Sequence, residues 1–320
     1  MKVVEMRLEG PPLELGPAGA VVTVGTFDGV HLGHRKVLAE IVQRSRSSGR
    51  NSVLVTFDPH PLKVIRPEQA PPLLTTLEEK IPLLEQTGID YLCVLPFTPT
   101  LRAYSARRFA TDVLLELVGM RELVMGYDHG FGRGREGSPD TMREIGGELG
   151  FEVDVVDAVV VDGEPVSSSR VRGLLSEGRV AEAGRLLARP YSLHGIVEAG
   201  AHQGRRLGFP TANVRVAGAD KMLPRGGIYA GYGSVGEIRL PGLIHLGPRP
   251  TFAGLGPSVE IHLLDWSGDL YGHDLRVEFC GWLREIVAFD SVEALVDQMH
   301  RDAEAGRALL SGAGSQSACA

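Results

Sequence analysis

Two histidines three residues apart, His31 and His34, end a glycine-rich segment that directly follows an apolar run. This spacing puts both rings on one face of the first turn of a helix, where they point to the same place. The glycines let backbone N–H groups approach a ligand, and a helix N-terminus favours an anion. The pair could also be two ordinary helix-start histidines, or a weak metal pair that lacks a third ligand. Its position after a strand-like run favours the anion site, with the candidate residues Gly25, Phe27, Asp28, Gly29, Gly33, His31 and His34.

A run of three serines precedes Arg170 and Arg172 at the start of a later helical segment. One serine at such a place is usually only an N-cap. Three hydroxyls followed by two guanidinium groups favour an oligophosphate site, because arginine binds phosphate oxygens bidentately. Two anion sites at helix starts indicate a nucleoside triphosphate, and the absence of a G-x-x-x-x-G-K-[ST] string excludes a P-loop enzyme. The candidate residues are Ser167, Ser168, Ser169 and Arg172.

The segment Gly132–Gly137 matches the G-x-G-x-x-G pattern, and Asp154 and Asp157 follow at about the distance expected in a dinucleotide-binding fold. We reject that interpretation because the segment follows the fourth strand-like run and is separated from it by residues 126–131. A loop is the better prediction. Arg133 and Arg135 of this loop are expected near a phosphate, and Asp128, just before it, is expected to be a polar contact at the strand end.

A short loop with two prolines, Phe57–Pro61, ends the second strand-like run. Asp58 and His60 in this loop are candidates for binding the same ligand, because ligands of parallel sheets bind at the carboxyl ends of strands. The alternative is a rigid connection with a surface aspartate, and the residues alone favour neither interpretation.

The most specific string lies in the second half, at residues 204–213. Thr211 and Asn213 alternate onto one face of an extended segment, and their oxygens suit a hard cation such as Mg²⁺. The alternative is a barrel turn in which both residues cap the backbone. Asn213 is one of only two asparagines in the chain, which modestly favours function. The candidates for nucleotide or ligand binding are Gly204, Arg206, Gly208, Phe209, Pro210, Thr211 and Asn213.

Glu260 lies in the strand-like segment 258–264. Period-two alternation places Glu260 and His262 on one face and the apolar residues between them on the other. Most strand carboxylates with apolar neighbours simply face solvent. The residues alone therefore leave a solvent-facing role and a catalytic role both open.

The elements that must position these residues differ between the two halves. Short apolar runs in the first half alternate with helix-length amphipathic segments, which predicts right-handed crossovers and a doubly wound parallel α/β sheet. Two short helices are expected at 167–187. The strands are expected at 21–24, 52–57, 91–95, 123–125 and 153–156, and the helices at 35–46, 77–86, 106–117 and 139–149.

After Arg189 the pattern changes to period two with frequent glycine and proline, which predicts a compact antiparallel β-barrel. A terminal helix is expected at 291–310 with a serine cap, followed by a disordered tail at 311–320. The boundary between the domains is expected near residue 187, giving domains 1–186 and 187–310. The barrel strands are expected at 191–198, 228–234, 243–246, 258–264 and 275–279.

Composition agrees with two ordinary soluble domains: the chain has 320 residues, of which 43% are hydrophobic and 23% are charged. A net charge of −7 gives no broad basic face for nucleic acid. No apolar run reaches the 18 or so residues of a membrane span, and the charged residues among the first seven, where a signal peptide would have an apolar stretch, lead us to expect neither export nor membrane insertion. The three cysteines are far apart, which excludes a zinc ribbon or a disulfide framework and favours a reducing cytoplasm.

Taken together, the motifs of the first half resemble the nucleotidyltransferase superfamily. The strings G-x-F-D-G-V-H-x-G-H, F-D-P-H-P and G-R-G-R-E-G resemble the FAD synthetase module of bifunctional riboflavin kinase/FAD synthetases. The family usually has threonine where this chain has Ser169, and a hydroxyl is kept. In the second half, L-G-F-P-T-A-N, L-P-R-G-G-I-Y, G-P-R-P-T, V-E-I-H and L-Y-G occur in the order of the riboflavin kinase module. There His245 stands where the family usually has asparagine, which could change affinity or make activity sensitive to pH.

The resemblance implies that the domain 187–310 phosphorylates riboflavin with ATP to give FMN and ADP. Glu260 would be the base, and Thr211 and Asn213 would bind Mg-ATP. The domain 1–186 would adenylylate FMN with ATP, giving FAD and pyrophosphate, without a protein nucleophile. His31, His34, the serine hydroxyls and Arg172 would stabilise charge there. Implied partners are these small molecules, with Mg²⁺ as the cofactor.

Two other functions stay open at this stage. The first is a nucleotidyltransferase that acts on another phosphorylated acceptor, such as a pantetheine or polyol phosphate, while the barrel only binds substrate. Thr211, Asn213 and Glu260 count against it, because a passive barrel needs no second Mg-ATP site. The other is a flavin-binding or regulatory protein without turnover, which the intact motifs disfavour. Such a protein would be yellow yet inert with ATP.

Overall fold

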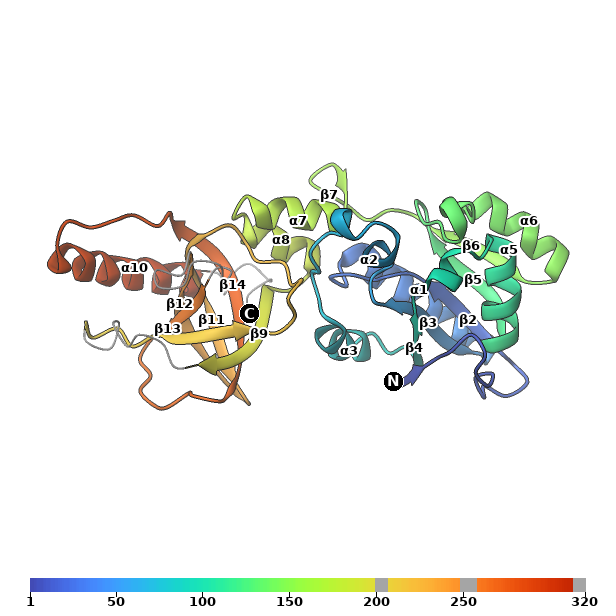
Figure 1. The fold of residues 1–320 in the computed structure, drawn as a ribbon, viewed down its shortest axis with the longest axis horizontal. Helices are drawn as coiled ribbons and strands as arrows, with labels where there is room; N and C mark the ends of the chain where they lie inside the picture. Colours follow the sequence, from blue (N-terminus) through green and yellow to red (C-terminus); the bar gives the residue numbers. More distant parts are fainter. Residues whose placement is uncertain (199–206, 248–257, 313–320) are drawn as a thin grey trace. The chain divides into compact units, whose positions relative to one another are not determined.

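The computed structural model describes residues 1–198, 207–247 and 258–312 (Figure 1). The chain divides into two compact units, Met1–Ser167 and Ser168–Ala320. The first unit contains a parallel sheet with helices, and the second contains a closed barrel with a terminal helix. The fold expected from the sequence is therefore confirmed in both halves.

Six strands form the sheet of the first unit in the order β1-β4-β3-β2-β5-β6, and every neighbouring pair is parallel. The edge strand β1 (Lys2–Glu5) is missing from the sequence prediction because it is short and mostly exposed, so it shows no apolar run. The order brings the carboxyl ends of β3, β2 and β5 together at one edge. The five expected strands are β2 (Ala20–Val24), β3 (Asn51–Asp58), β4 (Tyr91–Pro96), β5 (Met120–Gly126) and β6 (Glu152–Val156).

Successive residues of the central strands enter two different apolar clusters, one on each face of this sheet. Val22 belongs to the first cluster, together with Phe109, and Val21 belongs to the second, together with Leu38. The helix expected at 106–117 is a helical turn followed by a π-helical segment. The helical elements are α1 (Leu32–Ser48), α2 (Pro61–Ile65), η1 (Pro67–Gln69), α3 (Leu77–Glu85), α4 (Pro99–Arg102), α5 (Ala106–Arg108), η2 (Phe109–Leu117), η3 (Arg133–Arg135) and α6 (Pro139–Leu149).

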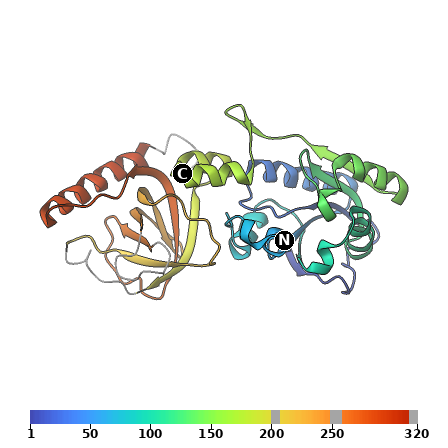
Figure 2. The ribbon, with the colours of Figure 1, turned by 45° about the horizontal axis from the view of Figure 1, so that its top comes forward.

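A small hairpin, β7 (Val160–Val161) and β8 (Glu164–Pro165), precedes two adjacent helices, α7 (Ser168–Ser176) and α8 (Val180–Leu187) (Figures 1 and 2). The two helices lie where the sequence predicts them. They are grouped with the barrel, because α8 packs on barrel strands with a buried apolar face. The compact units consequently divide before α7, whereas the expected boundary lies after α8.

The second unit closes six antiparallel strands into a barrel in the order β10-β13-β12-β11-β14-β9. The strand β10 (Ala212–Val216) is missing from the sequence prediction because it is short and overlaps the string that ends at Asn213. Gly231 permits close approach of two strands, since a Cβ there would lie 1.9 Å from the Glu278 carbonyl oxygen. The expected strands are β9 (Tyr191–Glu198), β11 (Gly227–Val235), β12 (Ile238–Gly247), β13 (Ser258–Leu263) and β14 (Asp274–Arg284).

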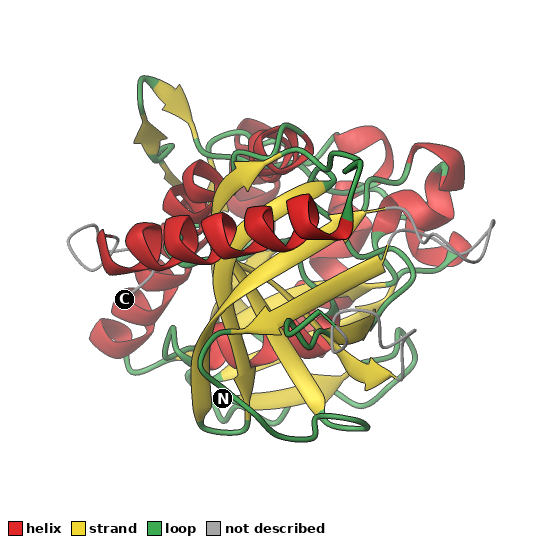
Figure 3. Cartoon of the chain, turned by 90° about the vertical axis from the view of Figure 1, so that its left-hand side faces the viewer, coloured by secondary structure: helices red, strands yellow, loops and turns green. Residues whose placement is uncertain are grey.

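The terminal helix α10 (Val292–Gly312) packs across β11, β12 and β14 (Figure 3). Its start has the expected serine cap, because the Ser291 hydroxyl accepts a hydrogen bond from the Ala294 N–H at 3.1 Å. Ser311 and Gly312, expected in a disordered tail, belong to the helix, where the Ser311 hydroxyl donates to the Arg307 carbonyl at 2.7 Å. The remainder of the expected tail lies outside the described residues.

Candidate active sites

The glycine-rich turn lies between β2 and α1, at the carboxyl edge of the parallel sheet. Phe27 and Val30 adopt left-handed backbone conformations, with φ of 47° and 43°. Such conformations are costly for residues with a side chain, above all for a β-branched valine, and they concentrate at functional sites. The strain is consistent with a turn whose shape serves a ligand.

His31 and His34 are brought together as the sequence predicts. His31 is the N-cap of α1, and its Nδ1 accepts a hydrogen bond from the His34 N–H at 3.3 Å. The two rings are stacked with centroids 3.6 Å apart, and the Phe27 ring lies 4.6 Å from that of His34. Burial lowers the pKa of His34 well below its usual value, and the charges of His31, Lys80 and His129 lower it further. The His34 imidazole is therefore neutral at neutral pH.

Asp28 supports this turn from inside the protein. Its side chain is buried, and its two oxygens accept hydrogen bonds from the N–H groups of Leu74 and Thr75 at 3.0 and 2.9 Å. The Thr75 hydroxyl in turn accepts a hydrogen bond from the Gly29 N–H at 3.0 Å. The carboxylate thus ties the segment before α3 to the turn. Thr75 is a supporting residue that no sequence motif indicated.

We expect Asp28→Asn to lower the free energy of unfolding of the first unit by about 2 kcal/mol, because an amide nitrogen would face a backbone N–H group in a buried site. Denaturant unfolding of the whole chain, followed by hydrogen exchange of amides 74 and 75, measures this loss. Asp157→Asn is the matched control, since Asp157 is exposed in the same unit. Equal stability of the two variants would contradict the supporting function of Asp28.

Lys80 is a second residue that the sequence did not single out. It lies on α3, is buried, and its Nζ donates a hydrogen bond to the Thr26 carbonyl at 2.7 Å. Burial lowers its pKa, although the charges of Asp28 and Asp58 oppose the shift. Its position within a regular helix with a capping box gave no local signal of a ligand site.

The other candidates of the first unit lie at ends of neighbouring strands. Asp58 is exposed at the end of β3, and the next histidine, His60, caps α2 by accepting a hydrogen bond from the Leu62 N–H at 3.2 Å. Asp128 lies just after β5 and is exposed, with its carboxylate 3.3 Å from Arg135. The segment around Arg133 forms only a short 3-10 turn, in agreement with the rejection of a dinucleotide-binding turn.

The serine run straddles the division between the units. Ser167 ends the first unit, and it follows Val166, whose carbonyl oxygen would lie 3.6 Å from a Cβ at Gly33. Ser168, Ser169 and Arg172 lie in the first two turns of α7 in the second unit. The expected placement of hydroxyls and guanidinium groups at a helix start is confirmed by the position of α7.

The barrel brings together Thr211, Asn213 and Glu260. Asn213 of β10 lies directly opposite Glu260 of β13 in the strand register. The Thr211 hydroxyl donates to Glu260 Oε2 at 3.4 Å, and the Ser258 hydroxyl donates to Oε1 at 3.5 Å. Both hydrogen bonds are long, and Glu260 is only partly buried. Hydroxyl and amide oxygens beside a carboxylate form a donor set that suits Mg-ATP.

Burial confirms the alternation predicted around Glu260. Val259 and Ile261 are buried in the barrel, whereas Glu260 and His262 are only partly buried on the other face. Phe209 is buried and has two ring neighbours, His262 at 5.1 Å and His300 of α10 at 4.9 Å. The carbonyl oxygen of Pro210 lies 2.8 Å from His262 Nδ1. Gly208 precedes Phe209 with φ of +80°, and Gly204 and Arg206 lie outside the described residues.

His245 is a direct neighbour of Glu260, because the two residues are opposite each other in the pairing of β12 with β13. Burial lowers the pKa of His245, and the charge of Arg284 lowers it further, while Glu260 opposes the shift. Arg284 is itself held by both carboxylate oxygens of Asp302 at 2.7–3.1 Å. A neutral imidazole therefore stands beside the candidate base at neutral pH.

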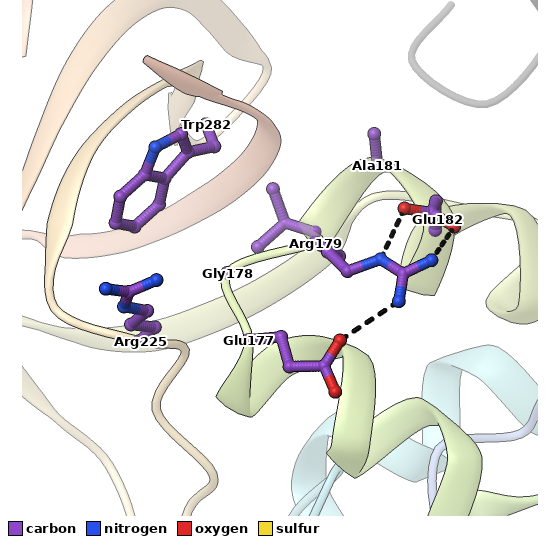
Figure 4. A pocket seen from close by; sticks show the side chains of 8 residues that line it. Glu177, Gly178, Arg179, Ala181, Glu182, Arg225 and Trp282 are labelled. Carbon is purple, nitrogen blue, oxygen red and sulfur yellow. Dashed lines mark hydrogen bonds and ion pairs between the residues drawn. The ribbon is translucent and has the colours of Figure 1, made fainter. Parts of the chain in front are cut away.

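A separate pocket of about 230 Å³ lies between the α7–α8 turn and the barrel (Figure 4). Arg179 bridges Glu177 and Glu182 at its rim, and the Trp282 ring forms part of its wall. Gly178 turns there with φ of +81°, and a Cβ would lie 2.8 Å from the Trp282 ring. The lining contains none of the residues predicted for binding or catalysis, so we assign the pocket to the packing of the turn on the barrel.

The side chains and helices of the described ranges limit which metal sites and membrane contacts are possible. No group of three or more histidine, cysteine, aspartate or glutamate side chains there could hold a metal ion. A magnesium site built on Thr211 and Asn213 does not depend on such a group, because its protein ligands are a hydroxyl and an amide. No helix in the described part of the chain is both long and apolar enough to cross a membrane.

Comparisons with known proteins cover nearly the whole chain. A family model for FAD synthetase matches residues 15–170, and one for riboflavin kinase matches residues 187–310. A bifunctional riboflavin kinase/FMN adenylyltransferase of Escherichia coli strain K12 is 36% identical over 285 residues, which is 89% of this chain and 90% of the relative. Its counterpart from Pseudomonas fluorescens is 38% identical over 292 residues, or 91% and 93% of the two chains.

A solved structure described as a macrolide-efflux protein from Streptococcus pneumoniae has the same fold, with a TM-score of 0.85 and 26% sequence identity. The match covers 95% of this chain and 98% of that one. The riboflavin kinase match counts against the alternative in which the barrel is a passive binding domain of a nucleotidyltransferase with another acceptor. The chain belongs to the family of bifunctional riboflavin kinase/FMN adenylyltransferases.

Proposed function

We propose that the chain makes FMN and FAD in two consecutive reactions. The barrel phosphorylates riboflavin with ATP, and the parallel-sheet domain adenylylates FMN with a second ATP. The observation that carries the proposal is the convergence of Thr211, Asn213 and Glu260 on one face of the barrel. The stacked pair His31 and His34 in the first half provides a second, separate candidate site. Riboflavin, FMN, FAD, ATP, ADP and pyrophosphate are its small-molecule partners.

In the barrel, Glu260 is the general base. Its carboxylate accepts the proton of the ribityl 5′-hydroxyl as that oxygen attacks the γ-phosphorus of ATP. The bond to the bridging oxygen breaks, ADP leaves, and FMN is formed. The hydroxyls of Thr211 and Ser258 orient the carboxylate through hydrogen bonds of 3.4 and 3.5 Å. Phe209, Pro210 and the glycines of the same segment shape the nucleotide and flavin contacts.

Thr211 and Asn213 are the proposed Mg²⁺ ligands of this domain. Their oxygens are hard donors, and both residues lie next to Glu260, where the phosphates of ATP must approach the hydroxyl. Bound Mg²⁺ would supply charge neutralisation on the ATP phosphates. Removal of one ligand should therefore weaken Mg²⁺ binding in this domain alone.

We expect Asn213→Ala to raise the Mg²⁺ concentration for half-maximal riboflavin phosphorylation by about tenfold, the usual cost of one lost metal-site interaction. A Mg²⁺ titration of FMN formation measures this shift. FMN adenylylation by the same sample is the internal control, since it takes place in the other unit. Identical Mg²⁺ curves for the variant and the unmodified chain would exclude Asn213 as a ligand.

In the parallel-sheet domain, an FMN phosphate oxygen attacks the α-phosphorus of ATP, and pyrophosphate leaves. The substrate phosphate is already a nucleophile, so the domain has to position the reactants and stabilise charge. His31 and His34 are the central proposed groups, with the serine hydroxyls and Arg172 as a second phosphate-binding segment. Asp58, His60 and Asp128 are proposed binding residues at the sheet edge.

We propose a cytoplasmic location for these reactions. Cys93 is a free and buried thiol, as is usual in reducing compartments. Burial raises the pKa of Cys93 to about 12, which keeps this thiol unreactive. We assign no catalytic function to Cys93.

The first test is to incubate the purified chain with riboflavin, ATP and MgCl₂ and to separate the flavins by chromatography over time. FMN that rises before FAD supports both reactions and their order. FMN without FAD would leave only the barrel reaction. Yellow protein that makes neither product, also from supplied FMN, would indicate flavin binding without turnover and overturn the proposal.

A further inference from the structure

We propose that His129 is a third histidine of the adenylyl-transfer site and binds the phosphate chain of the nucleotide with His31 and His34. This inference rests on the proposed function of the first unit. His129 follows β5, and β5 pairs with β2, the strand that leads into the glycine-rich turn. The parallel topology therefore brings His129 and this turn to the same edge of the sheet.

The ring of His129 lies over the start of the turn. A Cβ built on Gly25 would lie 3.4 Å from Cε1 of His129 and 3.0 Å from the Phe27 ring. The backbone N–H of His129 donates a hydrogen bond to the Gly126 carbonyl at 3.0 Å. The centroid of the His129 ring lies 6.0 Å from that of the Phe131 ring. The absence of a side chain at Gly25 thus leaves the space in which the imidazole stands.

Two imidazole nitrogens of this cluster lack the partners that buried polar atoms usually have. Nε2 of His129 and Nδ1 of His34 are buried, and neither has a hydrogen-bond partner among the described residues. Orphaned buried polar atoms are rare and point to a missing ligand, ion or water. Both residues are only partly buried as a whole. A phosphate oxygen is an acceptor that imidazole N–H groups can bind.

Burial and two charged groups of opposite sign, Arg135 and Asp128, act on the pKa of His129. Burial lowers the pKa of His129 to about 4, with a further lowering by Arg135 and a small opposing effect of Asp128. His34 is affected in the same direction by His31, Lys80 and His129. The nearby carboxylates are already engaged, since Asp28 accepts backbone hydrogen bonds and Asp128 pairs with Arg135.

Burial and neighbouring positive charges disfavour the protonated forms of His34 and His129, and a bound polyanion would offset part of this effect. The negative charge of the phosphate chain would raise the pKa values of His129 and His34 and favour their protonation. Binding of ATP is then coupled to proton uptake, and affinity for ATP increases as the pH falls from 8.5 towards 6. A ring that only packed on adenine or flavin would not produce this coupling.

The test uses the full chain, supplied FMN and the variant His129→Phe, which keeps a ring over Gly25 and removes both nitrogens. We expect the KM for ATP in FMN adenylylation to rise about tenfold, the effect of losing a charge-assisted hydrogen bond. We also expect the dependence of this KM on pH between 6 and 8.5 to become shallower. The KM for FMN and the rate of riboflavin phosphorylation should stay within about twofold, because neither depends on the phosphate contact.

An unchanged KM for ATP with an unchanged pH dependence would overturn the inference, and so would a rise confined to the KM for FMN. Should thermal unfolding show that His129→Phe disrupts the first unit, His129→Gln provides the same comparison with a polar, non-titrating side chain. If the unmodified chain makes no FAD, the proposed adenylylation is overturned, and the proposed contact between His129 and ATP is overturned as well. If either folded variant makes FAD with an unchanged KM for ATP and an unchanged pH dependence, the inference about His129 is overturned and the proposed adenylylation is kept.

Discussion

Glu260→Gln is expected to lower the rate of riboflavin phosphorylation by about 10²- to 10⁴-fold, the usual contribution of a positioned general base. Glutamine keeps the shape of the side chain and one of the two oxygens, so it can still accept a hydrogen bond from Thr211 or from Ser258, which donate to different oxygens of Glu260. It cannot accept the proton of the substrate hydroxyl. Chromatography of FMN formed from riboflavin under saturating ATP measures the loss.

Two comparisons separate loss of the base from loss of the fold. Adenylylation of supplied FMN by the same variant should stay within about twofold, because the match to FAD synthetase covers residues 15–170, outside the barrel. Glu237→Gln is the matched control, since Glu237 is an exposed carboxylate in the connection between β11 and β12. Kinase activity that survives in Glu260→Gln would exclude the base assignment. Loss of both activities in this variant would indicate general damage.

The architecture was predictable because hydrophobic periodicity is a local property. The central strands of the sheet are apolar runs buried on both faces, and most barrel strands alternate as half-buried strands do. The missed strands lack these signals: β1 is an exposed edge, and β10 overlaps a motif rich in turn residues. The compact units divide before α7 because α8 packs against the barrel, a long-range contact that no local pattern indicates.

The candidate sites were predictable only where a site lies in a short string. His31 and His34 are neighbours in sequence, and helix geometry alone places them together. Glu260 is separated from Thr211 by almost fifty residues, and only closure of the barrel pairs β10 with β13. Packing between distant elements places Lys80 and His129 near the glycine-rich turn and His34. Their local sequences resemble an ordinary helix and an ordinary loop.

Replacing both His31 and His34 by alanine is expected to lower FMN adenylylation by at least about a hundredfold, since each lost donor to a developing charge typically costs that much. Riboflavin phosphorylation should continue, so FMN accumulates in place of FAD. Chromatography of the two flavins from one incubation measures both effects. A parental rate of FAD formation in the double variant would contradict the assignment of the adenylyl-transfer site.

The double variant also removes the N-cap of α1, because His31 Nδ1 accepts the His34 N–H. Loss of a cap costs about 1 kcal/mol of stability, which could slow the reaction without any contact to substrate. His31→Asn separates the two effects, since asparagine is a preferred N-cap but lacks the ring that stacks on His34 at 3.6 Å. If His31 binds phosphate, His31→Asn should lose activity like His31→Ala while it recovers thermal stability. Recovery of activity together with stability would assign His31 to capping and leave His34 as the histidine of the pair that acts on the nucleotide.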